Sequence, residues 1–291
     1  MDHASKPPGN KLPHGWPRRL RRLLIVLACC YLGVALVLMA LENWLVYHPV
    51  RASQDWGTPP NERVRDLELH PADGTLIHAW WCPAEGARGA VLYCHGNAGN
   101  LSHRSGTIAA LQHHLHESVL IFDYPGYGKS SGRPTEAGCY AAADAAYDWL
   151  VQEQKVLPRD ILLFGGSLGG AVAVDLASRK PHRALVLLKT FTQAPDVAQS
   201  MYPWLPVRWL MRNHFDNLGK IHLCKQPVFI VHGTTDSVVP FVQGERLFAA
   251  ANEPKFFLPM EGVDHNDPVS PDFFIELRKF LARAEANAPP G

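Results

Sequence analysis

Ser167 lies at the centre of a Gly-X-Ser-X-Gly pattern at residues 165–169. The apolar run 160–164 precedes this pattern, and the helix-forming run 171–177 follows it. A sharp turn between a strand and a helix needs glycines because neighbouring backbone approaches closely, and it leaves the serine hydroxyl exposed at the end of the strand. The pattern predicts a nucleophilic serine, although a turn that only packs a helix against a sheet would use the same glycines.

A serine hydroxyl is a weak nucleophile, so it needs a base that takes its proton and an acid that orients the base. Asp236 comes shortly after the apolar run 227–231. His265 comes shortly after the run 255–258. Ligand sites of open α/β sheets lie at such strand ends. We therefore expect Ser167 to attack a carbonyl carbon, His265 to move the proton and Asp236 to orient His265.

Two other acids compete for the role of Asp236. Asp264 and Asp267 lie close to His265 in sequence, but each is only one or two residues away from it. Asp236 also has a plainer interpretation, since an aspartate after a strand is often a helix N-cap or a turn former. We favour Asp236 as the acid.

The run His-Gly-Asn-Ala-Gly-Asn at residues 95–100, called the 95–100 turn below, follows the apolar strand expected at 91–94. Its small residues allow backbone N–H groups to face a ligand, and preorganised donors of this kind stabilise the negative charge that develops on a carbonyl oxygen. We expect the N–H groups of Asn97 and Leu168 to form this oxyanion hole. His95 is expected to fix the turn rather than to act as a second base.

Several motifs resemble those of a known family and cover most of residues 60–283. They are the 95–100 turn, DYPGYGKS at 123–130, FGGSLGGA at 164–171, TFT at 190–192, YPWLP at 202–206 and GVDHND at 262–267. In these motifs, and in the order Ser, Asp, His, the chain resembles α/β-hydrolases of the membrane-anchored bud-emergence or alpha/beta-hydrolase-domain-containing (ABHD) group. The resemblance implies an α/β-hydrolase fold and a triad that maps onto Ser167, Asp236 and His265. One departure is Lys189, where relatives often carry an acidic residue.

The elements that would position these residues appear as apolar runs that alternate with longer helical stretches. The runs are 76–82, 89–94, 118–123, 160–164, 184–188, 227–231 and 255–258, and the helical stretches include 101–116, 136–152 and 240–251. Continuous apolar strands alternating with helices predict a mainly parallel sheet, covered on both faces. We expect about eight strands within one catalytic domain at residues 60–285.

The connection at residues 190–226 is longer than a plain crossover and is rich in aromatic and other large apolar residues. It is expected to form a small helical lid that shapes an apolar acyl pocket over Ser167. A small helical subdomain with its own core would have the same composition, and both interpretations remain open.

Residues 23–41 form an uncharged run of 19 residues, long enough as a helix to cross most of a hydrocarbon core about 30 Å thick. Trp44 and Tyr47 follow, where interfacial aromatic residues settle. We expect an uncleaved transmembrane signal anchor at residues 23–45. A cleaved signal peptide would have a shorter apolar region and a small-X-small site. Lipid attachment at Cys29 is disfavoured because the apolar run continues beyond it.

Charge is distributed unevenly along the chain. Residues 1–22 contain six basic residues and one acidic residue, whereas the whole chain has a net charge of +1, so the remainder is mildly acidic. Basic residues beside an anchor remain in the cytoplasm. We expect residues 1–22 to form a disordered cytoplasmic tail and the catalytic domain to lie on the opposite side, whether periplasmic, lumenal or extracellular. An acidic body gives no basic face for nucleic acid.

The remaining histidines and cysteines give no sign of a metal site. The chain has 15 histidines, and His113, His114 and His116 lie in an expected helix without Cys or carboxylate partners at metal-ligand spacing. Four cysteines of the catalytic domain are scattered singly and are expected to pack as small hydrophobic residues, namely Cys82, Cys94, Cys139 and Cys224. We expect neither a metal nor an organic cofactor.

These features together predict a membrane-anchored serine hydrolase that transfers the acyl group of an ester or thioester to water. Its partners would be a small-molecule or acylated substrate and, through residues 23–45, the membrane. An aminopeptidase-like amide hydrolase could use the same triad, and a non-catalytic scaffold with the hydrolase fold is an alternative of another class. The sequence leaves the oligomeric state open.

Overall fold

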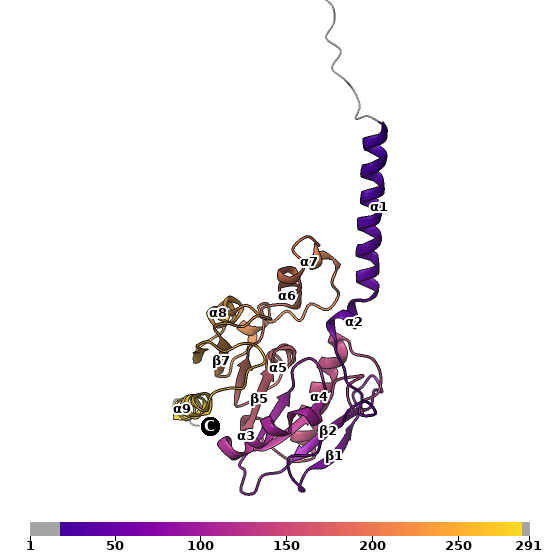
Figure 1. Cartoon of the computed structure of the whole chain (residues 1–291). Helices are drawn as coiled ribbons and strands as arrows, with labels where there is room; N and C mark the ends of the chain where they lie inside the picture. The colour runs from indigo at the N-terminus through magenta and orange to yellow at the C-terminus, as the bar shows by residue number, and fades with distance from the viewer. Residues whose placement is uncertain (1–17, 287–291) are drawn as a thin grey trace, which may run out of the picture. The chain divides into compact units, whose positions relative to one another are not determined.

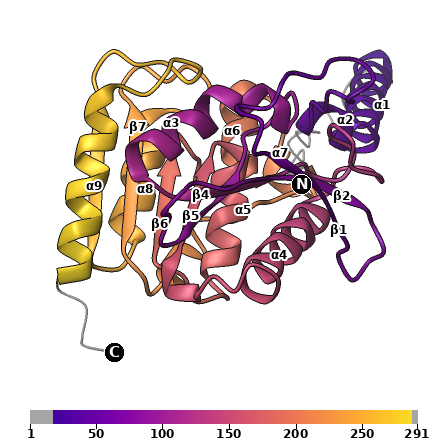
Figure 2. The same ribbon diagram turned by 90° about the horizontal axis from the view of Figure 1, so that it is seen from below.

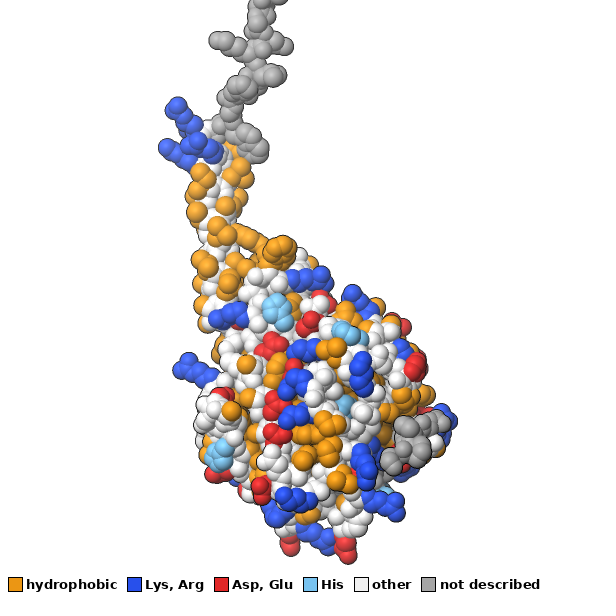
Figure 3. Space-filling model, turned by 180° about the vertical axis from the view of Figure 1, so that it is seen from behind, with side chains coloured by type: hydrophobic (Ala, Val, Ile, Leu, Met, Phe, Trp, Pro, Cys, Tyr) orange, Lys and Arg blue, Asp and Glu red, His pale blue; other side chains and the backbone are white. Residues whose placement is uncertain are grey.

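The structure, a computed structural model, describes residues 18–286 and divides into two compact units, residues 1–42 and 43–291. The first unit contains the helix α1 (Arg18–Ala40), which is long and apolar enough to cross a membrane as judged by length and composition (Figure 1). Apolar side chains cover this helix, and basic side chains lie at one of its ends (Figure 3).

The boundaries predicted for the N-terminal region need correction. The anchor predicted at residues 23–45 is too long at its end, because α1 ends at Ala40 and Asn43 already belongs to the second unit. Tyr47, predicted as an interfacial aromatic residue, is buried in that unit.

Residues 18–22, predicted as the end of a disordered tail, belong to α1, because arginine has a high helix propensity and continues the helix of the apolar run. Residues 1–17 of that predicted tail and the proline-rich residues 288–291 lie outside the described residues. The short helix α2 (Glu42–Val46) follows α1 and leads into the second unit.

The second unit, which contains the catalytic domain predicted from the sequence and is called the catalytic unit below, is built on one eight-stranded sheet in the order β1-β2-β4-β3-β5-β6-β7-β8 (Figure 2). The strand β2 pairs antiparallel with β1 and with β4, and all other pairs are parallel. The strands are β1 (Arg65–Leu69), β2 (Ile77–Cys82), β3 (Ala90–Cys94), β4 (Ser118–Phe122), β5 (Ile161–Gly166), β6 (Ala184–Leu188), β7 (Val228–Gly233) and β8 (Lys255–Met260). The predicted mainly parallel sheet of about eight strands is confirmed.

The strand β1 has no counterpart among the seven apolar runs that the sequence offered. Its sequence Arg-Asp-Leu-Glu-Leu alternates charged and apolar residues, and only Leu69 at its end is buried. An antiparallel edge strand keeps one face in water and carries charge, so it lacks the continuous apolar run of a central parallel strand.

Helices cover both faces of this sheet. One apolar cluster joins alternate strand residues such as Leu92 to the helices α4 (Glu136–Gln152), α5 (Leu168–Ala177) and α8 (Phe241–Ala250). A second cluster joins the intervening residues, such as Val91, to α3 (Ser105–Leu115) and α9 (Pro271–Ala286). The two-residue period of the strands therefore directs side chains into two separate cores.

Local sequence signals explain where two of the predicted helices begin. Thr135 precedes α4, and its hydroxyl accepts a hydrogen bond from the Gly138 N–H at 3.0 Å, as an N-cap residue does. The helix predicted at 101–116 is instead a 3₁₀ turn, η1 (Leu101–Arg104), followed by α3. Asn100 caps this turn by accepting from the Ser102 N–H at 3.0 Å. A further 3₁₀ turn, η2 (Pro158–Asp160), precedes β5.

The connection between β6 and β7 contains three short helices, α6 (Ala194–Met201), α7 (Val207–Leu210) and the 3₁₀ turn η3 (Ile221–Leu223). An ion pair of 2.7 Å between Asp196 and Arg208 joins α6 to α7. The large apolar residues of this connection differ in their exposure to solvent. Leu205 and Phe215 are buried, whereas Met201, Tyr202, Trp204 and Trp209 are exposed.

Candidate active site

Ser167 occupies a strained turn between β5 and α5. Its backbone has φ +50° and ψ −119°, which is a conformation that side-chain-bearing residues rarely adopt. The Ser167 N–H donates to the Leu188 carbonyl at 2.9 Å, and the Thr190 hydroxyl donates to the Ser167 carbonyl at 2.8 Å. These bonds to the end of β6 and the residues beyond it hold the strained residue in place.

Two glycines make this turn possible. A Cβ atom on Gly169 would lie 2.0 Å from the Cys94 carbonyl oxygen at the end of β3. A Cβ atom on Gly165 would lie 2.3 Å from the Gly169 carbonyl oxygen. The Gly-X-Ser-X-Gly pattern therefore has a steric cause, because α5 starts in direct contact with β3 and leaves no room for side chains.

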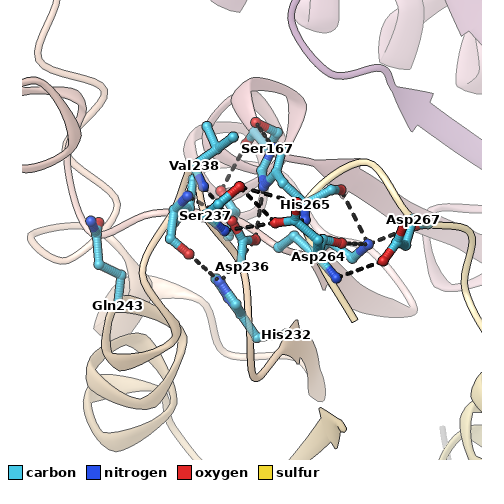
Figure 4. Close-up of polar contacts among 12 residues, drawn as sticks. Ser167, His232, Asp236, Ser237, Val238, Gln243, Asp264, His265 and Asp267 are labelled. Atoms are coloured by element: carbon cyan, nitrogen blue, oxygen red, sulfur yellow. Dashed lines mark hydrogen bonds and ion pairs between the residues drawn. The ribbon is translucent and has the colours of Figure 1, made fainter. Parts of the chain in front are cut away.

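The structure brings Ser167, Asp236 and His265 together from the ends of three different strands (Figure 4). The Ser167 Oγ atom lies 3.1 Å from His265 Nε2, and His265 Nδ1 lies 2.8 Å from the Asp236 carboxylate. With the proton on Nδ1, the imidazole donates to Asp236 and can accept the serine proton at Nε2. This is the geometry that a nucleophile, a base and an orienting acid require.

The Asp236 carboxylate is buried, accepts three hydrogen bonds and lies close to His232. Its Oδ1 accepts from the Val238 and Val239 N–H groups at 3.0 and 2.7 Å, and its Oδ2 faces His265 and, at 3.3 Å, His232 Nε2. Burial alone would raise the pKa of Asp236, but the interactions with His232, His265 and the Val239 N–H outweigh it and hold that pKa well below its ordinary value. Asp236 is therefore a fixed negative charge beneath the imidazole.

The two rival acids have other partners. Asp264 accepts from the Ser237 N–H at 2.7 Å, from the Ser237 hydroxyl at 2.8 Å and from the His265 backbone N–H at 2.7 Å. Asp267 accepts from the Asp264 N–H at 2.8 Å. Among the described residues, Asp236 is the acid whose carboxylate contacts the His265 ring, while Asp264 and Asp267 shape the loop that carries it.

Lys189 holds the loop at residues 264–267 in place, a role that the sequence did not reveal. Its ammonium group donates to the carbonyl oxygens of Asp264, His265 and Asp267 at 2.7, 3.1 and 2.7 Å. Burial lowers the pKa of Lys189, and the carboxylates of Asp236, Asp267 and Asp264 act in the opposite direction. The only sequence signal was a charged residue directly after the apolar strand β6.

We expect Lys189→Met to lower kcat about 10²-fold with little change in KM, because an unanchored loop moves the His265 imidazole away from Ser167. The three orphaned carbonyl groups also cost about 1–3 kcal/mol each in the free energy of unfolding. Initial rates of ester hydrolysis, measured well below the unfolding temperature, separate the effect on kcat from the effect on the free energy of unfolding. Lys279→Met, which removes an exposed lysine paired with Glu276 on α9, is the matched control. An unchanged kcat in Lys189→Met would contradict the role in positioning.

The 95–100 turn lies beside the nucleophile. A Cβ atom on Gly96 would be 3.6 Å from the Ser167 Cβ atom. The Asn97 side chain is held away from the site, since it donates to the Val46 carbonyl at 2.6 Å and accepts from the Tyr127 hydroxyl at 2.6 Å. Leu168 is the first residue of α5, so its N–H has no acceptor within the helix. The segments that carry both residues predicted for the oxyanion hole thus lie beside Ser167.

The chain segment before β1 is bonded directly to this turn. Val50 donates to the Gly99 carbonyl and accepts from the Gly128 N–H, both at 3.0 Å, which forms part of two isolated bridges. The His48 N–H donates to the Asn97 side chain at 3.2 Å. We call residues 46–51 the strap, because they hold the 95–100 turn from outside the sheet.

Two buried histidines support the site. His95 packs against Tyr124 with ring centroids 4.5 Å apart, and the Tyr124 hydroxyl donates to the His95 carbonyl at 2.7 Å. His232, which the sequence reasoning missed, donates to the Val239 carbonyl at 2.8 Å and so braces the Asp236 loop. The sequence pattern that could have indicated His232 is the one found at His95, namely a His-Gly pair after an apolar run.

No metal site is evident in the described part of the chain, which contains no cluster of three or more His, Cys, Asp or Glu side chains suited to a metal ion. His114 stacks on Phe274 of α9, with ring centroids 4.2 Å apart. The four cysteines of the catalytic unit are buried and unpaired. Burial raises the pKa of the Cys82 and Cys224 thiols to about 12, so they remain protonated packing groups.

Comparison with known proteins finds related sequences and folds. A family model described as alpha/beta hydrolase fold matches residues 89–212. Uncharacterized protein Rv2307c of Mycobacterium tuberculosis is 40% identical over 271 residues, which cover 91% of this chain and 96% of that protein. Alpha/beta hydrolase domain-containing protein 17B of Xenopus laevis is 30% identical over 250 residues, covering 84% and 85% of the two chains. The fold is similar to that of the Pyrococcus furiosus esterase PF2001, with a TM-score of 0.66, 19% identity and coverage of 82% and 98%.

Proposed function

We propose, since this chain belongs to the α/β-hydrolase superfamily and is a hydrolase of the ABHD type, that it acts as a membrane-anchored serine hydrolase on esters or thioesters. The observation that supports this proposal best is the chain of contacts from Ser167 Oγ to His265 Nε2 and from His265 Nδ1 to Asp236, at 3.1 and 2.8 Å.

The reaction follows from these contacts. Ser167 Oγ attacks the carbonyl carbon while its proton moves to His265 Nε2, and the carbonyl oxygen becomes an oxyanion. The N–H groups of Asn97 and Leu168 stabilise that oxyanion, a contribution worth about 2.7–4 kcal/mol for one donor. His265 then protonates the leaving alkoxide or thiolate, and an acyl-serine remains. Water, deprotonated by His265, attacks the acyl-serine, and the imidazolium returns this proton to Ser167 Oγ as the carboxylic acid leaves.

The buried carboxylate of Asp236 stabilises the imidazolium that forms in both steps. Its pKa lies below the ordinary value, so it keeps its negative charge while His265 is positively charged. The proton stays on the imidazole and does not pass to Asp236. The residues present thus supply a nucleophile, a general base and oxyanion donors from this chain.

The proposed anchor determines on which side of the membrane the reaction takes place. We place α1 across a membrane with its basic end in the cytoplasm, which puts the catalytic unit on the opposite side. Residues 190–226 would act as the lid over Ser167, and the substrate would be a small or acylated molecule that reaches that face.

A panel of leaving groups tests the proposed activity. We expect the purified full-length protein in detergent to hydrolyse p-nitrophenyl esters and acyl thioesters much faster than aminoacyl p-nitroanilides, because alkoxides and thiolates leave the tetrahedral intermediate more readily than amines. Initial rates at equal substrate concentration provide the comparison. Turnover confined to the anilides would instead identify an aminopeptidase-like enzyme, and absence of turnover with every class would favour a scaffold.

A further inference from the structure

A short tether fixes one end of the catalytic unit near the bilayer, provided that α1 spans the membrane as proposed above. The helix α1 ends at Ala40, and the catalytic unit begins at Asn43. Three residues of fully extended chain reach about 10 Å. Asn43 therefore lies within about 10 Å of Ala40, the last residue of α1, whatever the angle between the two units.

The segment after α7 is bonded to this tether point. Asn213 donates from its amide to the Asn43 side chain at 2.9 Å and accepts from the Tyr47 hydroxyl at 2.7 Å. Asn43 also donates to the Pro134 carbonyl at 3.3 Å. Asn213 is buried in these contacts, so the chain immediately before it is held at the membrane-proximal end of the unit.

The residues held there are aromatic and exposed. Trp209 is 89% exposed, Trp204 is 58% exposed, and Trp44 next to the tether point is 74% exposed. Met201 and Tyr202 add further exposed apolar area. Large aromatic side chains exposed on the surface of a folded unit mark a contact with something outside it.

The charged residues in and around residues 197–215 indicate which kind of partner the exposed aromatic residues contact. Residues 197–215 contain no Asp or Glu and include Arg208 and Arg212, of which Arg208 is paired with Asp196 at 2.7 Å. Tryptophan and tyrosine settle at the level of lipid headgroups, and neighbouring arginines are attracted to anionic lipids. A protein partner would satisfy the aromatic surface equally well, but the tether puts the bilayer within reach of every molecule.

We propose that the aromatic surface formed by Trp44 and residues 201–212 rests in the headgroup layer of the membrane that holds α1. The occupant is the lipid surface itself, with anionic headgroups near the arginines. The lid segment would then be in contact with the leaflet, and acyl chains carried in that leaflet would be the substrates nearest to Ser167.

Site-specific labels on the full-length protein test this contact. Both variants carry Cys29→Ala and Cys30→Ala in α1, and the four remaining cysteines are buried and remain unlabelled. Trp209→Cys places a fluorophore in the aromatic surface. Leu157→Cys is the control, since Leu157 is 49% exposed and lies before β5, at the opposite end of that strand from Ser167. Both proteins are reconstituted into vesicles of phosphatidylethanolamine and phosphatidylglycerol that contain a nitroxide lipid with its spin label at headgroup depth.

We expect the nitroxide lipid to quench the label at position 209 severalfold more strongly than the label at position 157. Equal weak quenching at both positions would overturn the proposal. Energy transfer between labels on two copies, without quenching by lipid, would overturn it in favour of self-association.

A second measurement separates this proposal from the proposed activity. The variant Trp44→Ser changes the aromatic surface outside residues 190–226, and it should hydrolyse a long-chain ester embedded in the vesicles severalfold more slowly than the wild type, with an unchanged rate on a short water-soluble ester. An equal loss on both esters would contradict the membrane contact. If no ester is hydrolysed but position 209 is quenched, the proposed activity fails and the surface contact stands.

Discussion

Replacing Ser167 with alanine is expected to lower kcat on the order of 10⁶-fold and to abolish labelling by a fluorophosphonate probe. The substitution removes the atom that attacks the carbonyl carbon while the contact between His265 and Asp236 at 2.8 Å remains. A probe that reacts only with an activated serine reports the loss directly. Turnover of p-nitrophenyl esters gives the change in kcat.

The matched control is Ser237→Ala. Ser237 lies in the neighbouring loop, and its hydroxyl donates to Asp264 at 2.8 Å rather than to His265. We expect this variant to retain labelling and most of its activity. Equal labelling of the wild type and Ser167→Ala would remove Ser167 as the nucleophile, whatever the turnover data show.

Asp236→Asn is expected to reduce kcat about 10⁴-fold. The Val238 and Val239 N–H groups keep the asparagine oxygen at the Oδ1 position, so the NH2 group faces His265 Nδ1 and the imidazole prefers the wrong tautomer or turns away. The 3.1 Å contact between His265 Nε2 and Ser167 would then no longer transfer the serine proton. Steady-state kinetics on the same esters measures this loss.

Asp264→Asn distinguishes between the candidate acids. Asp264 reaches His265 only at its backbone N–H, at 2.7 Å, so its removal should slow the reaction about tenfold or less. If Asp264→Asn were the more damaging substitution, the assignment of Asp236 as the orienting acid would be wrong.

The low pKa of Asp236 also predicts how stability depends on pH. The folded-state pKa is lower than that of an unfolded chain, which is about 3.9 for aspartate. Asp236 therefore contributes stability that is fully present above about pH 4 and is lost as the pH falls through its lower folded pKa. The difference in free energy of unfolding between wild type and Asp236→Asn should narrow below about pH 4. Denaturant unfolding at several pH values measures it.

The sequence was sufficient to predict the sheet and the proximity of the three candidate catalytic residues. Ser167, Asp236 and His265 each follow an apolar run, and parallel strands bring their carboxyl ends to one edge. The strand β1 was missed because its charged residues face water and leave no continuous apolar run.

The supporting contacts were harder to predict because they join distant parts of the chain. Lys189 follows β6 like any other strand-end residue, and its bonds to carbonyl groups about 75 positions later depend on backbone geometry rather than on residue types. The same holds for the strap, whose residues lie about 50 positions before the turn that they bind. The residues of a site can thus be read from patterns, whereas the contacts that hold it rigid require the fold.

The strap also determines where the chain can be shortened to obtain a water-soluble enzyme. A cut directly before Asn43 removes α1 and leaves the bonds from Val46 and Val50 to the 95–100 turn intact. A cut beyond Arg51 looks equally harmless in the sequence, since it falls before β1, but it deletes residues 46–51, which bond to the 95–100 turn. Two truncated proteins that differ by fewer than ten residues would then differ in the support of the 95–100 turn, and the shorter one would also lose the buried Tyr47.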